Sequence, residues 1–166
     1  MSYAGTMKTS ARDEFEAWAG TYDRSLLNRF MFQPSYRMFL EELYAWRKDI
    51  DEPFDLLDIG CGYGYFLAAC REKGYEVQGL DISDWAVRYA TEKLRLPVAV
   101  GDLGNHALFQ KEFDVITMWH FLEHTPDPHG ALRSAKAWLK KDGLLVVEVP
   151  NYQGTDAQKR WQDWEG

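Results

Sequence analysis

The spacing of hydrophobic positions changes near residue 54 and divides the chain into two parts. Before that point, apolar side chains recur every three or four residues, which predicts a short helix over 12–20 and a longer one that opens at Pro34. After it, short apolar runs alternate with amphipathic stretches, as expected for strands alternating with helices. The pattern therefore predicts a helical extension or lid in residues 1–53 and an α/β core in residues 54–150.

The core contains five apolar runs that we interpret as strands. They are expected at residues 54–59, 77–81, 97–100, 113–119 and 144–149. Helices are expected at 64–73 and 84–95 and from Pro128 to about residue 139, followed by a turn in which Gly143 takes a positive φ. Apolar strands that alternate with helices form a parallel sheet covered on both faces. The predicted fold is Rossmann-like: a doubly wound, mainly parallel sheet.

The last stretch, residues 151–166, is polar apart from two tryptophans and one tyrosine. The apolar strand before it would normally pair with a further neighbour, because an open apolar edge invites aggregation. We therefore expect residues 151–166 to be a truncated C-terminal segment, with the last strands of such a fold absent.

Composition and charge restrict the possible partners. The chain has 166 residues, of which 46% are hydrophobic, and a formal net charge of −7. This fits one folded domain that acts on a small molecule, and it disfavours broad nucleic-acid binding, which needs clustered basic residues. The two cysteines form no metal-binding pair, residues 1–8 lack the apolar core of a signal peptide, and no apolar run in the sequence reaches the length of a membrane span. A cytoplasmic protein without a membrane partner is predicted.

Three glycines at alternate positions follow the first strand of the core. Gly60, Gly62 and Gly64 form a tight turn between a buried strand and a helix, where the backbone can approach a ligand closely. The helix that follows is expected to present free N–H groups at this turn. In an open α/β sheet, small ligands bind at this carboxyl end of the strands. The turn therefore predicts a site for a small polar molecule.

The residues around the turn discriminate between ligands. A dinucleotide fingerprint has the spacing G-x-G-x-x-G, but here the third glycine position is Tyr65, which would hold the helix away from the strand. Asp58, at the entrance to the turn, repels a pyrophosphate and favours a cationic group. An NAD-dependent oxidoreductase is therefore a disfavoured alternative.

Five segments together resemble the class I S-adenosylmethionine-dependent methyltransferases. The sequence Asp58-Ile59-Gly60-Cys61-Gly62-Tyr63-Gly64 is similar to the first motif of that family. The later segments follow in order and at ordinary spacing: Asp81-Ile82-Ser83, Gly101-Asp102-Leu103, Phe113-Asp114-Val115-Ile116 and Leu139-Lys140-Lys141-Asp142-Gly143-Leu144-Leu145. The resemblance covers residues 54–150.

The resemblance implies a binding role for particular residues. The glycine turn would approach the methionine part of S-adenosylmethionine, with Asp58 near its ammonium group. Asp81 would accept hydrogen bonds from the ribose hydroxyls, Ile82 would pack on the adenine, and Asp102 would accept from the adenine amino group. Tyr22, in the front segment, would fold over the cofactor or simply pack in the protein. The predicted cofactor-binding residues are Tyr22, Asp58, Gly60, Cys61, Gly62, Gly64, Asp81, Ile82, Asp102, Leu103 and Trp119.

The segment after the fourth strand resembles the ubiquinone-biosynthesis O-methyltransferases through its Leu-Glu-His-x-x-Asp-Pro run, residues 122–128. In one interpretation, His120 acts as a general base or positions the acceptor. In a second, His120, Glu123 and His124 bind a divalent metal, and in a third, Glu123 and His124 only brace the loop. The inverted zinc-peptidase motif is rejected, because Pro126 would end the required helix. We predict His120 as the catalytic residue and no metal site.

These patterns predict a methyltransferase that moves a methyl group from S-adenosylmethionine to a small-molecule acceptor and leaves S-adenosylhomocysteine. The competing hypothesis is a domain that binds the same cofactor without turnover. Methyl transfer mainly requires the nucleophile and the methyl group to be held in line, so a dedicated base is not obligatory.

Overall fold

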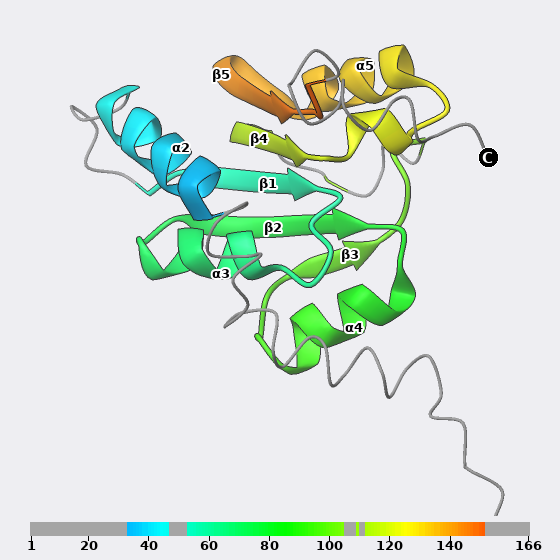
Figure 1. Ribbon diagram of the computed structural model, residues 1–166, viewed down its shortest axis with the longest axis horizontal. Coiled ribbons are helices and arrows are strands. Elements are labelled where there is room, and N and C mark those ends of the chain that lie inside the picture. Colours follow the sequence, from blue (N-terminus) through cyan, green and yellow to red (C-terminus); the bar gives the residue numbers. More distant parts are fainter. Residues whose placement is uncertain (1–32, 47–52, 105–108, 110–111, 152–166) are drawn as a thin grey trace, which may run out of the picture. The chain divides into compact units, whose positions relative to one another are not determined.

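A parallel five-stranded sheet forms the centre of the described part of residues 52–166 (Figure 1). The computed structural model describes residues 33–46, 53–104, 109 and 112–151. The strands are β1 (Asp55–Ile59), β2 (Glu76–Asp81), β3 (Val98–Val100), β4 (Phe113–Trp119) and β5 (Leu139–Glu148). Their order across the sheet is β3-β2-β1-β4-β5, and each neighbouring pair is parallel. The predicted Rossmann-like fold class is confirmed.

The described part of the chain forms four α-helices, two of which begin at capping residues that the sequence predicts. They are α2 (Gln33–Trp46), α3 (Tyr65–Glu72), α4 (Asp84–Glu92) and α5 (Pro128–Trp138), with a short 3₁₀ helix η3 (Leu122–His124). The Ser83 hydroxyl accepts a hydrogen bond from the backbone N–H of Ala86 at the start of α4. The Asp127 carboxylate accepts one from Gly130 N–H at 2.8 Å at the start of α5. Both helix starts agree with the prediction.

The strand order reverses between β1 and β4, and this reversal determines where a ligand can bind. From β1 the chain moves outward to β2 and β3, whereas from β4 it moves outward in the opposite direction to β5. Right-handed crossovers therefore place α3 and α4 on one face of the sheet and α5 on the other. Loops at the carboxyl ends of β1 and β4 diverge at this point and leave a crevice, which is where open α/β sheets bind small molecules.

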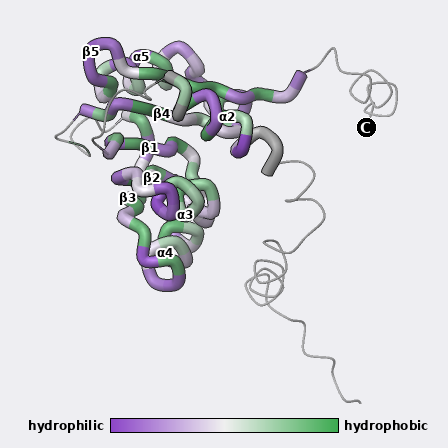
Figure 2. Tube along the Cα trace, turned by 90° about the vertical axis from the view of Figure 1, so that its left-hand side faces the viewer, coloured by the Kyte–Doolittle hydropathy of each residue, from purple (hydrophilic) through white to green (hydrophobic). Residues whose placement is uncertain are grey.

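The two central strands form the core. Leu56, Leu57 and Ile59 of β1 are buried, and so are all the side chains of β4 from Phe113 to Met118. Burial on both sides is what a central parallel strand requires. By contrast, hydrophilic and hydrophobic stretches alternate along the helices, each of which buries one face (Figure 2). The carboxyl ends of β1 and β4 are therefore anchored in a rigid core.

Two element boundaries differ from the prediction. α4 ends at Glu92 rather than near residue 95, and Arg95 itself has a φ of 56°, outside the helical region. β5 starts at Leu139, directly after α5, so the expected turn lies inside an irregular strand. The residue with positive φ there is Asp142, at 65°, and not Gly143. Gly143 instead allows a close approach, since an added Cβ would lie 2.8 Å from Cγ of Leu139.

The chain divides into two compact units between residues 51 and 52. α2 belongs to the first unit and begins one residue before the predicted Pro34. The predicted helix over 12–20, Tyr22 and the segment 152–166 lie outside the described residues, so the lid and the truncated tail stay predictions. Within the described ranges, no helix is long and apolar enough to cross a membrane.

Candidate functional site

The three glycines of the turn all adopt the backbone conformation that the pattern predicts. The φ angles are 75° at Gly60, 52° at Gly62 and 78° at Gly64. A Cβ at Gly60 would lie 2.6 Å from Cδ2 of Phe121, and a Cβ at Gly64 would lie 2.6 Å from Cδ1 of Leu96. Two of these positions therefore require glycine both for φ and for space.

Four N–H groups of the turn itself, before the first residue of α3, are bonded within the protein. Gly60 and Cys61 both donate to the carbonyl oxygen of Leu80, at 2.7 and 3.2 Å, and Gly64 donates to Cys61 O at 2.9 Å. Gly62 donates to the carboxylate of Asp81 at 2.8 Å. Because these four amides already have acceptors, the turn does not form the N–H cradle that binds phosphate. This arrangement supports the argument against a pyrophosphate.

Asp81 lies at the carboxyl end of β2 and is oriented by two backbone groups. Its Oδ2 accepts from Gly62 N–H and its Oδ1 accepts from Ser83 N–H, each at 2.8 Å. One carboxylate thus joins the glycine turn to the start of α4. An ionised carboxylate has about four acceptor directions, so each oxygen retains one for a ligand. The group is suited to accept from two adjacent hydroxyls.

Asp58 is buried and does not line the cavity described below. Its Oδ1 accepts a hydrogen bond of 2.7 Å from the hydroxyl of Thr117, the residue opposite it on β4. Burial raises the pKa of Asp58 to about 8; the Thr117 bond opposes this rise and the charge of Asp81 adds to it. The carboxyl group is therefore largely neutral at pH 7. A cation placed beside it would favour ionisation, so its predicted role near an ammonium group stays a prediction.

Cys61 contributes packing and a backbone amide rather than a reactive thiol. The side chain is buried, and an added Cβ at Gly79 of β2 would lie 2.7 Å from its Sγ. Burial is the main cause that raises the pKa of the Cys61 thiol far above its usual range. A protonated, buried thiol is inert.

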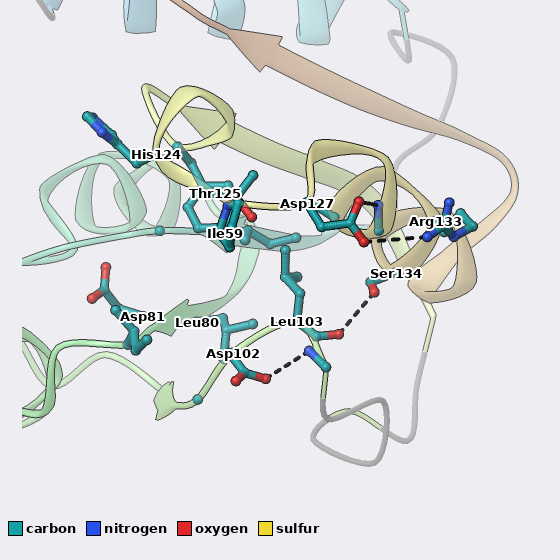
Figure 3. A pocket seen from close by; sticks show the side chains of 18 residues that line it. Ile59, Leu80, Asp81, Asp102, Leu103, His124, Thr125, Asp127, Arg133 and Ser134 are labelled. Carbon is teal, nitrogen blue, oxygen red and sulfur yellow. Dashed lines mark hydrogen bonds and ion pairs between the residues drawn. The ribbon is translucent and has the colours of Figure 1, made fainter.

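A cavity of about 660 Å³ opens at the carboxyl ends of β1, β2 and β3 (Figure 3). Gly60, Asp81, Ile82, Asp102 and Leu103 line one part of it. Ile82 is 79% exposed, although it is a large apolar side chain. This volume is typical of sites for small organic ligands. Five of the predicted cofactor-binding residues are therefore brought together at one cavity.

The loop after β3 carries Asp102 in a fixed orientation. Asp102 Oδ1 accepts from the backbone N–H of Gly104 at 2.8 Å, which closes a turn between side chain and backbone. At the other end of the loop, Gly101 N–H donates to the carbonyl oxygen of Asp81 at 3.0 Å. The loop is thus attached to the end of β2, next to the Asp81 carboxylate.

His120 lies directly after β4 and is held by β5. Its φ is 49°, and its backbone N–H donates to the carbonyl oxygen of Glu148 at 2.9 Å. In the side chain, Nε2 lies 3.0 Å from Oε1 of Glu148 and Nδ1 lies 3.3 Å from Oε1 of Glu123. The imidazole is therefore oriented by two carboxylates, as a residue that positions a substrate or moves a proton must be.

Trp119 and His124 occupy different surroundings from His120. The Trp119 ring packs edge-on against Phe66 of α3, with centroids 5.1 Å apart, and does not line the described cavity. His124 does line it, and its Nε2 lies 3.9 Å from Oε1 of Glu123. Within the described residues, no group of three His, Cys, Asp or Glu side chains is arranged to hold a metal ion. The geometry of Glu123 fits the bracing interpretation.

Sequence reasoning missed several contacts of the site. Thr117 bonds to Asp58, Glu148 contacts His120, and Phe121 packs over Gly60. Each contact joins residues that are distant in sequence or depends on how the loop after β4 folds back. Only the polar Thr117 inside an apolar run offered a signal, since a buried hydroxyl needs a partner. Tyr22 lies outside the described residues, and its role stays a prediction.

Comparison with known sequences finds similarity to methyltransferases. The sequence model of a family described as "methyltransferase domain" matches residues 24–166. A ubiquinone biosynthesis O-methyltransferase from Haemophilus ducreyi is 38% identical over 106 residues, which are 58% of this chain and 45% of that protein. The corresponding protein of Glaesserella parasuis is 35% identical over the same shares. The chain thus spans less than half the length of these relatives.

Solved structures share the fold. A coclaurine N-methyltransferase bound to N-methylheliamine and S-adenosylhomocysteine matches with a TM-score of 0.55 and 27% identity, covering 68% of this chain and 35% of that one. A sugar N-methyltransferase from Streptoalloteichus matches with a TM-score of 0.66 and 22% identity, covering 93% of this chain and 60% of that one. The second likeness concerns the fold alone.

Proposed function

Since the chain belongs to the methyltransferase domain family, we propose that it binds S-adenosylmethionine and transfers the methyl group to a small-molecule acceptor. The observation that carries this proposal is the Asp81 carboxylate. It is oriented by Gly62 and Ser83 at one wall of the cavity, beside the exposed apolar face of Ile82. An acceptor for paired hydroxyls next to an apolar surface is what a nucleoside requires.

The proposed contacts follow the cavity wall. Asp81 accepts from the two ribose hydroxyls, and Ile82 packs against one face of the adenine, which would cover its exposed side chain. Asp102 accepts from the adenine amino group through the oxygen that Gly104 does not occupy. The glycine turn approaches the methionine part, with Asp58 near the ammonium group. A neutral Asp58 beside an arriving cation would ionise and release a proton.

Transfer requires alignment and removal of a proton from the acceptor. S-adenosylmethionine supplies a methyl group already activated by its sulfonium and leaves as S-adenosylhomocysteine. The chain supplies His120, whose ring is held between Glu123 and Glu148 at the end of β4. We propose that His120 positions the acceptor or takes up its proton. A metal-free site is proposed as well.

Two other functions stay open to test. The second candidate is a domain that binds the same cofactor without turnover. An NAD-dependent oxidoreductase is disfavoured by Tyr65 and by the occupied amides of the glycine turn. A cytoplasmic location and the absence of nucleic-acid binding stay predictions based on composition.

A thermal-shift experiment separates these proposals. The chain is melted with S-adenosylhomocysteine and, separately, with NAD. A ligand present at 100 times its dissociation constant stabilises the folded state by about 2.7 kcal/mol, so the cofactor class should be evident. We expect a rise in Tm with S-adenosylhomocysteine only. A rise with NAD alone would overturn the proposal, and binding without methylation of any acceptor in a panel would favour the non-catalytic domain.

Asp81→Ala tests the position of the ribose. Two hydroxyl contacts to a charged acceptor are lost, so the affinity for S-adenosylhomocysteine should fall at least tenfold in a calorimetric titration. Asp84→Ala is the matched control, because Asp84 is an exposed carboxylate of α4 that pairs only with Arg88 within the described contacts. Equal affinities of the two variants would show that the ribose lies elsewhere.

A further inference from the structure

The peptide group between Leu103 and Gly104, in the cavity wall, is hydrogen-bonded through both its carbonyl and its N–H. The hydroxyl of Ser134, on α5, donates to the carbonyl oxygen of Leu103 at 2.9 Å. The N–H of Gly104 donates to Asp102 Oδ1 at 2.8 Å. The carbonyl of Leu103 and the N–H of Gly104 belong to the same planar peptide group, and Figure 3 shows both bonds in the cavity wall.

The geometry of this peptide group links the position of the Ser134 hydroxyl to the orientation of the Asp102 carboxylate. In a trans peptide the C=O and the N–H point in opposite directions, and the described chain has no cis peptide. Ser134 therefore fixes the plane from one side, and the plane directs Asp102 from the other. Hydrogen bonds in such a series also polarise one another, so that the first strengthens the second.

Ser134 is buried and joins α5 to the loop that carries Asp102. It is 5% exposed and lies 31 residues from Leu103 in sequence, on a helix that follows a different strand. Its neighbours Ala131 and Ala135 on α5 are buried and apolar. A hydroxyl in that environment costs free energy unless it is bonded, and the described bond goes to the adenine-side loop.

We propose that Ser134 is a positioning residue for base recognition: through the Leu103–Gly104 peptide it aligns the Asp102 carboxylate with the amino group of the cofactor's adenine. The inference rests on the proposed function, because it assumes that an adenine occupies the cavity beside Asp102. It adds α5 to the determinants of cofactor specificity, although Ser134 itself makes no contact with the base.

The test compares two ligands that differ at C6 of the purine and at its neighbour N1, which is an acceptor in the adenine form and carries a hydrogen in the inosine form. S-adenosylhomocysteine carries an amino group at C6, whereas S-inosylhomocysteine carries an oxo group that a carboxylate repels. We expect the wild-type chain to prefer the adenine form about 10- to 100-fold, as a hydrogen bond to a charged group predicts. In Ser134→Ala this preference should fall about fivefold or more, with affinity for the inosine form changed less than twofold.

Controls separate positioning from general weakening. Thr91→Ala removes a hydroxyl that donates to the carbonyl oxygens of Val87 and Arg88 on α4, outside the cavity wall, and should leave the preference unchanged. In an Asp102→Ala background, Ser134→Ala should no longer alter the preference, because its effect passes through Asp102. Ser134→Thr retains the hydroxyl and should restore the preference. If Ser134→Ala does not fold, Ser134→Cys, with its weak donor, takes its place in the same comparison.

The outcomes distinguish a failure of the proposed cofactor binding from a failure of the proposed role of Ser134. If the wild-type chain binds neither ligand, the proposed function fails. If it binds S-adenosylhomocysteine with the expected preference but Ser134→Ala weakens both ligands equally, the proposed function stands and the positioning role is overturned. A loss of preference that persists at full size in the Asp102→Ala background would also overturn it.

Discussion

Asp58→Asn should remove a specific pH dependence from the stability of the protein. The pKa of Asp58 is raised from 3.8 to about 8, chiefly by burial. Between these two values the folded chain binds a proton at Asp58 that the unfolded chain has released. The favourable contribution is therefore complete below about pH 4 and is lost as the pH rises to about 8. Asparagine cannot ionise, so the variant lacks this loss.

The magnitude follows from the proton linkage. One proton changes the free energy of unfolding by about 1.4 kcal/mol per pH unit inside the window. Between pH 5 and pH 8 the wild-type chain should therefore lose about 3–4 kcal/mol relative to the variant, as an upper limit for a buried group. The amide also introduces a donor into the space of a buried carboxyl, at a cost of about 1–3 kcal/mol. That cost changes the difference in the free energy of unfolding between the two proteins by the same amount at every pH. It therefore does not alter how the difference depends on pH.

Urea denaturation at several pH values measures the difference directly. Other groups titrate in both proteins and largely cancel, so the difference between the two stabilities isolates Asp58. Asp84→Asn is the control, because it makes the same substitution at an exposed site. A difference that stays constant from pH 5 to pH 8 would show that Asp58 titrates normally, and the reasoning from burial would be refuted.

The same carboxyl tests the position of the ligand's ammonium group. If the cation lies near Asp58, binding should release close to one proton at pH 7, because the ionised form becomes favoured. Calorimetry of S-adenosylhomocysteine binding in buffers with different ionisation enthalpies counts the protons. Binding without proton release would move the ammonium away from Asp58 but would leave the burial argument intact.

Two further substitutions test how the sheet is held together. Lys140→Met removes the ammonium that lies 2.9 Å from Asp114, a nearly buried carboxylate, and should lower the free energy of unfolding in urea by about 1–2 kcal/mol; the exposed Lys141→Met should have little effect, and equal midpoints for both would contradict the argument. Gly79→Ala places a Cβ 2.7 Å from Sγ of Cys61 and should destabilise the chain by about 1–3 kcal/mol, measured in the same way. An unchanged midpoint there would mean that the contact relaxes without cost.

Local sequence patterns correctly predicted most strands of the sheet. The prediction for β4, residues 113–119, matches the structure at both ends, because an apolar run buried on both sides has clear boundaries. The helix starts at Ser83 and Asp127 were also correct, since capping depends on neighbouring residues alone. β5 was the exception. Pairing with β4 continues back to Leu139, and a contact between distant strands overrides the local turn signal at 141–143.

The candidate site also has some features that local sequence patterns predict and others that they do not. The conformations of Gly60, Gly62 and Gly64 could be predicted, because positive φ is a local property of glycine. The direction of the Gly60 and Gly62 amides could not, because their acceptors, Leu80 and Asp81, lie on the neighbouring strand. Likewise, the pairs Asp58–Thr117 and His120–Glu148 depend on how β1, β4 and β5 are aligned. Strand register depends on contacts between segments distant in sequence, so local patterns do not reveal it.

The two buried thiols allow local opening of the structure to be measured by chemical labelling. Cys61 of the glycine turn and Cys70 of α3 are the only cysteines in the sequence, and both are buried in the reduced form. Alkylating reagents attack an exposed thiolate, so the closed protein should react slowly at either position. The labelling rate at Cys61 would then report how often the turn opens, and that at Cys70 would report the helix behind it. Mass spectrometry of the modified peptides would resolve the motion of the cofactor turn separately from global unfolding.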